Sequence, residues 1–226
     1  MVLYSTEHNL LPSEMPLSQW DKVVDLWTRR TAELSEDARV KHIAIFENTG
    51  AAVGVTMPHP HGQIYAFPFV PPRVEREWGA ASVYSLQQKK CLHCNVLDEE
   101  RREQRRVIAE NASFTAFVPS FARFPYEMQI YAIRHMRSLS EFRDGEAEDL
   151  SSILLSTRKR YDRLFGGPMP LMMLLHQTLH LYVEFLPLQR SAHKLKYLAS
   201  VESSLGTFLQ DVNPEAAAVA LRNLII

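Results

Sequence analysis

Histidines recur along this chain at a nearly constant separation of about half its length. His8 and His135 lie 127 residues apart, and His59 and His180 lie 121 residues apart, in a chain of 226 residues. The predicted elements around them repeat as well, in the order strand, histidine, helix, strand, His-x-His or His-x-Tyr, strand. A repeat of this length with matching element order predicts a duplicated fold.

Hydropathy patterns place the elements of each copy. Residues 18–34, residues 146–165 and the segment after Pro214 have helical spacing or good helix formers, and they predict helices. The apolar, β-prone segments are predicted strands, while the Gly- and Pro-rich residues 47–60 predict a loop; the strands are 1–5, 42–46, 62–70, 126–133, 171–175 and 180–186. We therefore expect an α/β (α+β) fold with a mainly antiparallel sheet and helices packed on it.

The first copy is expected to be incomplete. In the second copy a cysteine pair, Cys91 and Cys94, precedes its first histidine by 41 residues, and the same spacing before His8 falls upstream of Met1. We therefore assign residues 1–85 to an incomplete N-terminal half and residues 86–226 to a C-terminal half. The chain enters in what looks like mid-strand, which favours truncation over a naturally short form or a misassigned start.

Charge and hydropathy exclude several classes of partner. Lys and Arg number 25 and Asp and Glu number 26, so a formal charge of −1 gives no general attraction to nucleic acid or to an anionic membrane. The longest apolar run is about half a membrane span, and the N-terminus lacks the basic and apolar regions of a signal peptide. These observations predict a cytoplasmic protein.

The segment from Phe46 to Ile64 carries the chemistry. His59, His61 and Gln63 alternate along an extended chain and so project to one side. Gly50 and Gly54 permit tight turns whose amides can face a phosphate. A neutral imidazole whose other N–H is held by an acceptor can attack phosphorus and pass a nucleotidyl group to a second acceptor.

Thr56 can donate a further hydrogen bond to such a phosphate, and the Gln63 amide can hold an oxygen without acting as a base. The alternative for this segment is a proline-bounded surface turn with incidental histidines. The combination of Asn48, two glycines and two prolines with Gln63 in a single run favours the catalytic interpretation.

The cysteine pair predicts a metal site in the second copy. Cys91, Cys94, His135 and His180 form a four-ligand set that favours structural zinc, and a redox pair is the rival interpretation. His93, between the cysteines, is predicted to be a solvated turn residue. In the first copy the equivalent His8 and His59 are the remnant of a site without its cysteines.

The catalytic segment resembles the signature of a known family. Phe46-Glu47-Asn48-Thr49-Gly50 followed by His59-Pro60-His61-Gly62-Gln63 is similar to the galactose-1-phosphate uridylyltransferase family, a transferase branch of the histidine-triad superfamily. This branch carries glutamine where histidine-triad hydrolases carry a third histidine. The resemblance continues through Pro125-Tyr126-Glu127, His176-Gln177 and the tail from Arg190 to Glu202.

The resemblance implies a two-step, ping-pong exchange. His61 would take UMP from UDP-glucose, and galactose 1-phosphate would then collect it. The remaining implied contacts are with phosphates, through Asn48, Thr56 and Gln63, and with the nucleotide sugar across a homodimer interface, through Lys196, Tyr197 and Glu202. Family members usually also carry an additional N-terminal segment.

The resemblance also offers Glu77 and His176 as ligands of a second metal, iron. Tyr182 replaces a further histidine of that set, which argues against this site. Tyr182 also occupies the second copy's counterpart of His61, so only the first copy is expected to be catalytic. Two other functions stay open: a related adenylyl or nucleotidyl transferase or phosphorylase, and an inactive, truncated zinc-binding remnant acting as an interaction module.

Overall fold

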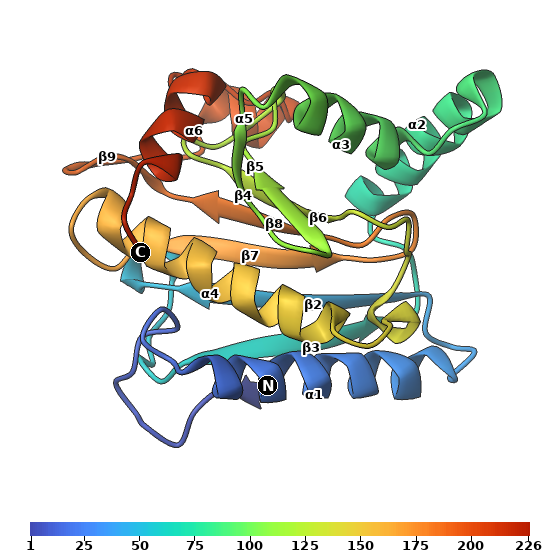
Figure 1. The fold of residues 1–226 in the computed structure, drawn as a ribbon, viewed down its shortest axis with the longest axis horizontal. Coiled ribbons are helices and arrows are strands. Elements are labelled where there is room, and N and C mark those ends of the chain that lie inside the picture. The colour runs from blue at the N-terminus through green and yellow to red at the C-terminus, as the bar shows by residue number, and fades with distance from the viewer.

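One antiparallel sheet of eight strands runs through both halves of the chain (Figure 1). The computed structural model describes residues 1–226. The strand order is β1-β3-β2-β7-β8-β6-β5-β4. The strands are β1 Val2–Leu3, β2 His42–Thr49, β3 His61–Phe67, β4 Val107–Glu110, β5 Phe114–Phe117, β6 Met128–Ala132, β7 Leu171–His176 and β8 Tyr182–Pro187, and a separate hairpin comprises β9 Gln189–Ser191 and β10 Lys194–Leu195.

Helices cover the sheet on both faces. They are α1 Leu17–Ser35, α2 Pro72–Gln88, α3 Leu92–Glu103, α4 Glu146–Leu164, α5 Ser200–Leu205 and α6 Pro214–Arg222. The largest core joins α1 and α4 to one face, where Trp27, Leu154 and Val183 are buried together. On the other face Leu97 of α3 packs with Tyr182. Tyr182 and Val183 are consecutive on β8, so their side chains point to opposite faces of the sheet and each packs in a different core.

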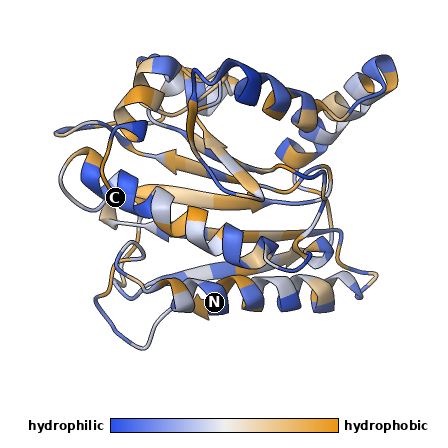
Figure 2. Cartoon of the chain, in the orientation of Figure 1, coloured by the Kyte–Doolittle hydropathy of each residue, from blue (hydrophilic) through white to orange (hydrophobic).

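Hydropathy explains why α1 takes this place. Trp20, Val23, Val24 and Trp27 are its buried apolar residues and recur at helical spacing, so they form one apolar stripe. Figure 2 shows the same division, with hydrophobic colour on the strands and much of the hydrophilic colour on outer helix surfaces. None of the helices combines the length and the apolar character that a membrane span requires.

The strand register shows that the fold is duplicated about the centre of the sheet. Phe46 of β2 pairs with Leu174 of β7. On one side Phe46 also pairs with Gln63 of β3, and on the other Leu174 pairs with Glu184 of β8. A pseudo-twofold axis therefore passes between Phe46 and Leu174 and relates Gln63 to Glu184.

The same axis identifies which strands correspond at the edges. Leu3 of β1 pairs with His61, as Tyr131 of β6 pairs with Tyr182. β1 is thus the counterpart of β6, and residues 1–226 contain no first-half counterpart of β4, β5 or α3. The expected duplicated, mainly antiparallel fold with an incomplete first copy is confirmed.

The predicted elements agree with the structure except in three places. The three predicted helices and the six predicted strands are present, with ends shifted by a few residues. The predicted loop 47–60 is wrong at its start, because residues 47–49 continue β2 and pair with β7. The helices α2, α3 and α5, the hairpin of β4 and β5 and the hairpin of β9 and β10 were not predicted. The proposed boundary between residues 85 and 86 falls within α2.

Gly62 shows how closely the first half is packed. The ring of Tyr4 is fully buried against Trp20 and Trp27. A Cβ atom added at Gly62 would lie 2.0 Å from the Tyr4 hydroxyl oxygen and 3.1 Å from the carbonyl oxygen of Phe46. Only glycine therefore lets β3 lie this close to the Tyr4 ring.

Replacing Gly62 by alanine is expected to lower the free energy of unfolding by about 1–3 kcal/mol, as overpacking of a core does. The matched control is Gly79→Ala, because Gly79 lies exposed inside α2 with no atom within 4 Å of an added Cβ. That variant is expected to gain about 0.5–1 kcal/mol from its better helix propensity. Urea unfolding measures both, and equal changes in the two variants would contradict the steric account.

Candidate functional site

A cavity of about 290 Å³ lies where β2 ends and β3 begins. Its walls bring together four of the predicted site residues, Asn48, Gly50, Thr56 and His61. Gln63 lies two residues beyond His61 on the same side of β3, and Gly54 lies in the loop, but neither lines the cavity. The sequence motif therefore folds into one concave site.

Hydrogen bonding fixes the tautomer of His61. Its Nδ1–H donates to the carbonyl oxygen of His59, 2.8 Å away. Because a carbonyl only accepts, the proton must sit on Nδ1, which leaves a lone pair on Nε2. In its neutral form the imidazole therefore presents the Nε2 lone pair, away from the His59 carbonyl.

Gly50 shapes the loop that closes the cavity. Its φ is 93°, in the left-handed region, and an added Cβ would lie 3.0 Å from the Pro170 Cβ. Both constraints require glycine here. The turn that follows, Ala51–Val53, is a short 3₁₀ helix that returns the chain toward Thr56.

A buried ion pair anchors the strand beneath Asn48. Glu47 of β2 and Arg158 of α4 are 1% and 3% exposed, and their oxygen and nitrogen atoms are 2.8 Å apart. The hydroxyl of Thr49 donates to Glu47, and the Arg158 guanidinium lies 5.1 Å from the centre of the Phe185 ring. Sequence reasoning missed Arg158, because Glu47 was placed in the predicted loop 47–60, where a carboxylate needs no buried cationic partner.

The predicted zinc ligands converge. One ligand atom from each of Cys91, Cys94, His135 and His180 lies within 4.8 Å of all the others. The Cys94 sulfur is 3.3 Å from Nδ1 of His135 and 3.6 Å from Nδ1 of His180. A tetrahedral zinc, with Zn–S about 2.3 Å and Zn–N about 2.0 Å, separates such donor atoms by about 3.5 Å.

The protonation states also suit a metal. His180 donates its Nε2–H to the carbonyl oxygen of Ala132 at 2.9 Å, so its Nδ1 lone pair faces the cysteines. The hydrogen bond between the two cysteines lowers the pKa of Cys91 to about 3 and raises that of Cys94, so the pair shares one proton, which a bound metal ion would displace. The four residues therefore fit a structural zinc ion.

His8 and His59 form half of an equivalent set in the first copy. His59 donates its Nε2–H to the carbonyl oxygen of Ser5, 2.8 Å away. Its Nδ1 faces Nδ1 of His8 at 3.3 Å. A backbone carbonyl thus orients His59 in the same way as His180, and His8 lies beside it, but no cysteines are present there.

The prediction for His93 is wrong. This residue lies in the first turn of α3, and its ring packs beside Tyr131, Tyr182 and His180. Burial lowers the pKa of His93 to about 4, so its ring is neutral at pH 7. It is part of the packing between α3 and the sheet rather than a solvated turn residue.

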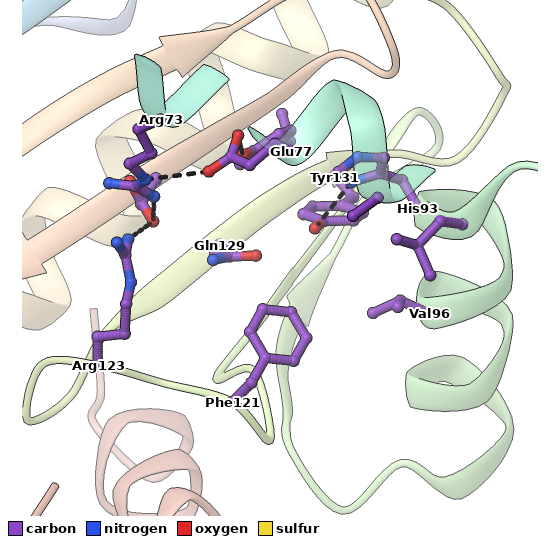
Figure 3. Close-up of a pocket in the computed structure, with 12 residues that line it drawn as sticks. Arg73, Glu77, His93, Val96, Phe121, Arg123, Gln129 and Tyr131 are labelled. Atoms are coloured by element: carbon purple, nitrogen blue, oxygen red, sulfur yellow. Dashed lines mark hydrogen bonds and ion pairs between the residues drawn. The ribbon is translucent and has the colours of Figure 1, made fainter. Parts of the chain in front are cut away.

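Glu77 and His176 lie close together, but the positive group beside them is an arginine side chain rather than a metal ion. Oε2 of Glu77 is 3.9 Å from Nδ1 of His176. The Arg73 guanidinium is 3.0 Å from carboxylate oxygens of both Glu77 and Glu184 (Figure 3). Because the Arg73 guanidinium already pairs with both carboxylates, these residues do not fit a second metal ion such as iron.

Glu184 is the most strongly held carboxylate in this region. It is 1% exposed and contacts Arg73, Arg123 and His176. Burial alone would raise its pKa, but the hydrogen bond with His176 and the charges of the two arginines hold that pKa well below its ordinary value. Neither arginine was singled out from the sequence, because their partners lie 111 and 61 residues away.

The C-terminal residues implied by the resemblance lie away from His61. Nζ of Lys196 donates to Oε1 of Glu202 at 3.0 Å and to the carbonyl oxygen of Leu209, so this pair holds its own segment together. Tyr197 is 76% exposed. None of these residues lines the cavity around His61.

Comparison with known proteins gives this geometry a context. Residues 1–71 match the profile of "Galactose-1-phosphate uridyl transferase, N-terminal domain", and residues 77–225 match the C-terminal domain of the same family. The chain is 42% identical to galactose-1-phosphate uridylyltransferase of Thermotoga maritima over 98% of its own length and 72% of that relative. It is 34% identical to the Saccharomyces cerevisiae enzyme over 99% of its length and 66% of that relative.

Solved structures share the fold. A uridylyltransferase structure superposes with a TM-score of 0.93 at 32% identity, over 97% of this chain and 72% of that one. An ADP-glucose phosphorylase from Arabidopsis thaliana, with bound ADP-glucose, has the same fold with a TM-score of 0.88 at 22% identity, over 99% of this chain and 72% of that one. The chain therefore belongs to the galactose-1-phosphate uridylyltransferase family of enzymes.

Proposed function

We propose that this protein exchanges UMP between UDP-glucose and galactose 1-phosphate through a uridylyl group held on His61. The hydrogen bond from His61 Nδ1–H to the His59 carbonyl carries this proposal, because it leaves the Nε2 lone pair free to attack phosphorus. The relatives named as galactose-1-phosphate uridylyltransferases supply the choice of substrates.

The exchange has two balanced steps. Nε2 of His61 attacks the α-phosphorus of UDP-glucose, an N–P bond forms, and the P–O bond to glucose 1-phosphate breaks. A phosphate oxygen of galactose 1-phosphate then attacks the same phosphorus, and the N–P bond breaks to give UDP-galactose. The imidazole is neutral before the first step and after the second, so the enzyme needs no net proton transfer.

Polar groups around His61 support the charged phosphoryl group. Asn48, Thr56 and the backbone at Gly50 line the same cavity. The Gln63 amide follows His61 on the same side of β3 and can hold a non-bridging oxygen as the geometry at phosphorus changes. The catalytic roles that we propose are thus nucleophile for His61 and stabilisation for Gln63 and Thr56, with Asn48, Gly50 and Gly54 in binding.

The zinc ion that we propose at Cys91, Cys94, His135 and His180 is structural. All four positions are filled by protein donors, which leaves no open position for a substrate. The ion would tie α3 to the loops after β6 and before β8. We propose no iron at Glu77 and His176, and no cysteine-completed site at His8 and His59 within this chain.

We also propose a cytoplasmic homodimer. Lys196, Tyr197 and Glu202 do not reach the cavity around His61 in their own chain. Tyr197 and Leu205 of this tail are 76% and 75% exposed, which leaves apolar surface for a second copy. In such a dimer the tail of one protomer would contact the nucleotide sugar bound by its partner.

Incubation with UDP-glucose is expected to add one UMP-sized mass to the intact protein. His61→Ala should abolish this adduct, while Gly79→Ala should retain it because Gly79 is exposed on α2 and does not line the cavity around His61. Intact-mass spectrometry measures both. A parallel incubation with ADP-glucose tests the adenylyl alternative. An adduct from neither donor would contradict nucleotidyl transfer and favour the zinc-binding remnant.

Removal of zinc is expected to lower the midpoint of thermal unfolding by about 10 °C, because a structural metal contributes folding free energy of several kcal/mol. His135→Ala should reduce bound zinc, measured by elemental analysis, below one ion per chain. The matched control His8→Ala should leave the zinc content unchanged. Equal zinc loss in both variants, or none in His135→Ala, would contradict the assignment.

A further inference from the structure

A second, larger cavity lies on the sheet face that carries Tyr182. Its volume is about 460 Å³, and its walls come from β6, β8, α2, α3 and the loop that contains Phe121 and Arg123. Figure 3 shows these side chains converging, with Gln129 in the middle, Phe121 on one side and Arg73 with Glu77 on another. The proposed transfer reaction uses none of them.

The pseudo-twofold axis relates this cavity to the catalytic half. Tyr182 and Glu184 stand at the strand positions of His61 and Gln63. Tyr182 has a phenol in place of the His61 imidazole, and its ring stacks 4.2 Å from that of His176. The second copy therefore keeps a binding cavity without the group that attacks phosphorus.

Gln129 supplies an unsatisfied acceptor inside the cavity. The residue is 4% exposed, and its Nε2–H donates to Oε1 of Glu127 at 3.0 Å. That bond fixes the amide orientation, and its Oε1 atom has no hydrogen-bond partner. Figure 3 shows the amide lying between Tyr131 and Phe121. A desolvated acceptor of this kind costs about 1–3 kcal/mol, which a ligand N–H would offset.

The remaining walls restrict the ligand further. The Phe121 side chain is 52% exposed and offers a face on which a planar ring can stack. Both arginines of the cavity, Arg73 and Arg123, are already paired with Glu184. The Glu77 carboxylate faces the same space, where it can accept hydrogen bonds from hydroxyl groups but repels phosphate.

We propose that this cavity binds a nucleoside that carries no phosphate. The base stacks on Phe121 and donates an N–H to Oε1 of Gln129, and the ribose hydroxyls donate to Glu77. A 5′-phosphate is disfavoured because Glu184 and Glu77 together balance the charges of Arg73 and Arg123, which leaves no net positive charge in the cavity. Binding here is separate from transfer at His61, since the two cavities share no lining residue.

NMR titration tests the proposal. The full chain is titrated with uridine and with adenosine, and binding is monitored through the side-chain amide signal of Gln129 and the methyl signals of Leu92 and Val96. At least one nucleoside should shift these signals with saturation, and its 5′-monophosphate should bind at least tenfold more weakly at the same signals. No shift with either nucleoside, or equal affinity for nucleoside and monophosphate, would overturn the proposal.

Two variants separate this cavity from other sites. Phe121→Ala should weaken nucleoside binding at least tenfold, whereas Phe69→Ala, an aromatic residue of similar exposure (54%) on another surface, should not. His61→Ala should abolish the UMP adduct and leave the Gln129 shift intact. Equal loss in the two phenylalanine variants would overturn the proposal, and loss of the shift in His61→Ala would assign it to the catalytic cavity instead.

Discussion

The pairing of β2 with β7 is the interaction on which both halves depend. Phe46 and Leu174 pair in this ladder at the pseudo-twofold axis, and β3 and β8 pair with the outer sides of β2 and β7. Because a slip of one residue in a strand pairing moves every side chain to the opposite face, this register decides what faces each cavity. The buried pair of Glu47 and Arg158 adds a second constraint beside it, since separating those charges would leave one of them unpaired in the core.

Backbone carbonyls orient the imidazoles of His59, His61 and His180. His61 and His180 each donate one ring N–H to a carbonyl oxygen, which leaves the other nitrogen with a lone pair. At His61 this nitrogen is Nε2, and we propose that it attacks phosphorus; at His180 it is Nδ1, and we propose that it binds zinc. The strand ends supply the carbonyl oxygens, so a single sheet geometry serves two kinds of chemistry.

The sequence could predict those parts of the structure that depend on local pattern or on repeated spacing. The helix at α1, the duplicated order and the convergence of Cys91 with His135 all follow from such patterns. The roles of Arg73 and Arg158 could not be predicted, because each depends on a carboxylate more than a hundred residues away in the chain. The loop assignment after Phe46 failed because pairing with β7 overrides the turn-forming character of the residues that follow.

The two copies place different groups at equivalent strand positions. In the first, His61 and Gln63 provide an imidazole and an uncharged amide. In the second, Tyr182 keeps its proton, and Glu184 is a carboxylate that pairs with Arg73 and Arg123. Because Glu184 and Glu77 together balance the two arginines, the second cavity has no net positive charge for a phosphate, in keeping with the nucleoside that we propose as its ligand. The second cavity is a partly apolar space with an unpaired amide oxygen, and such a space is suited to binding a ligand.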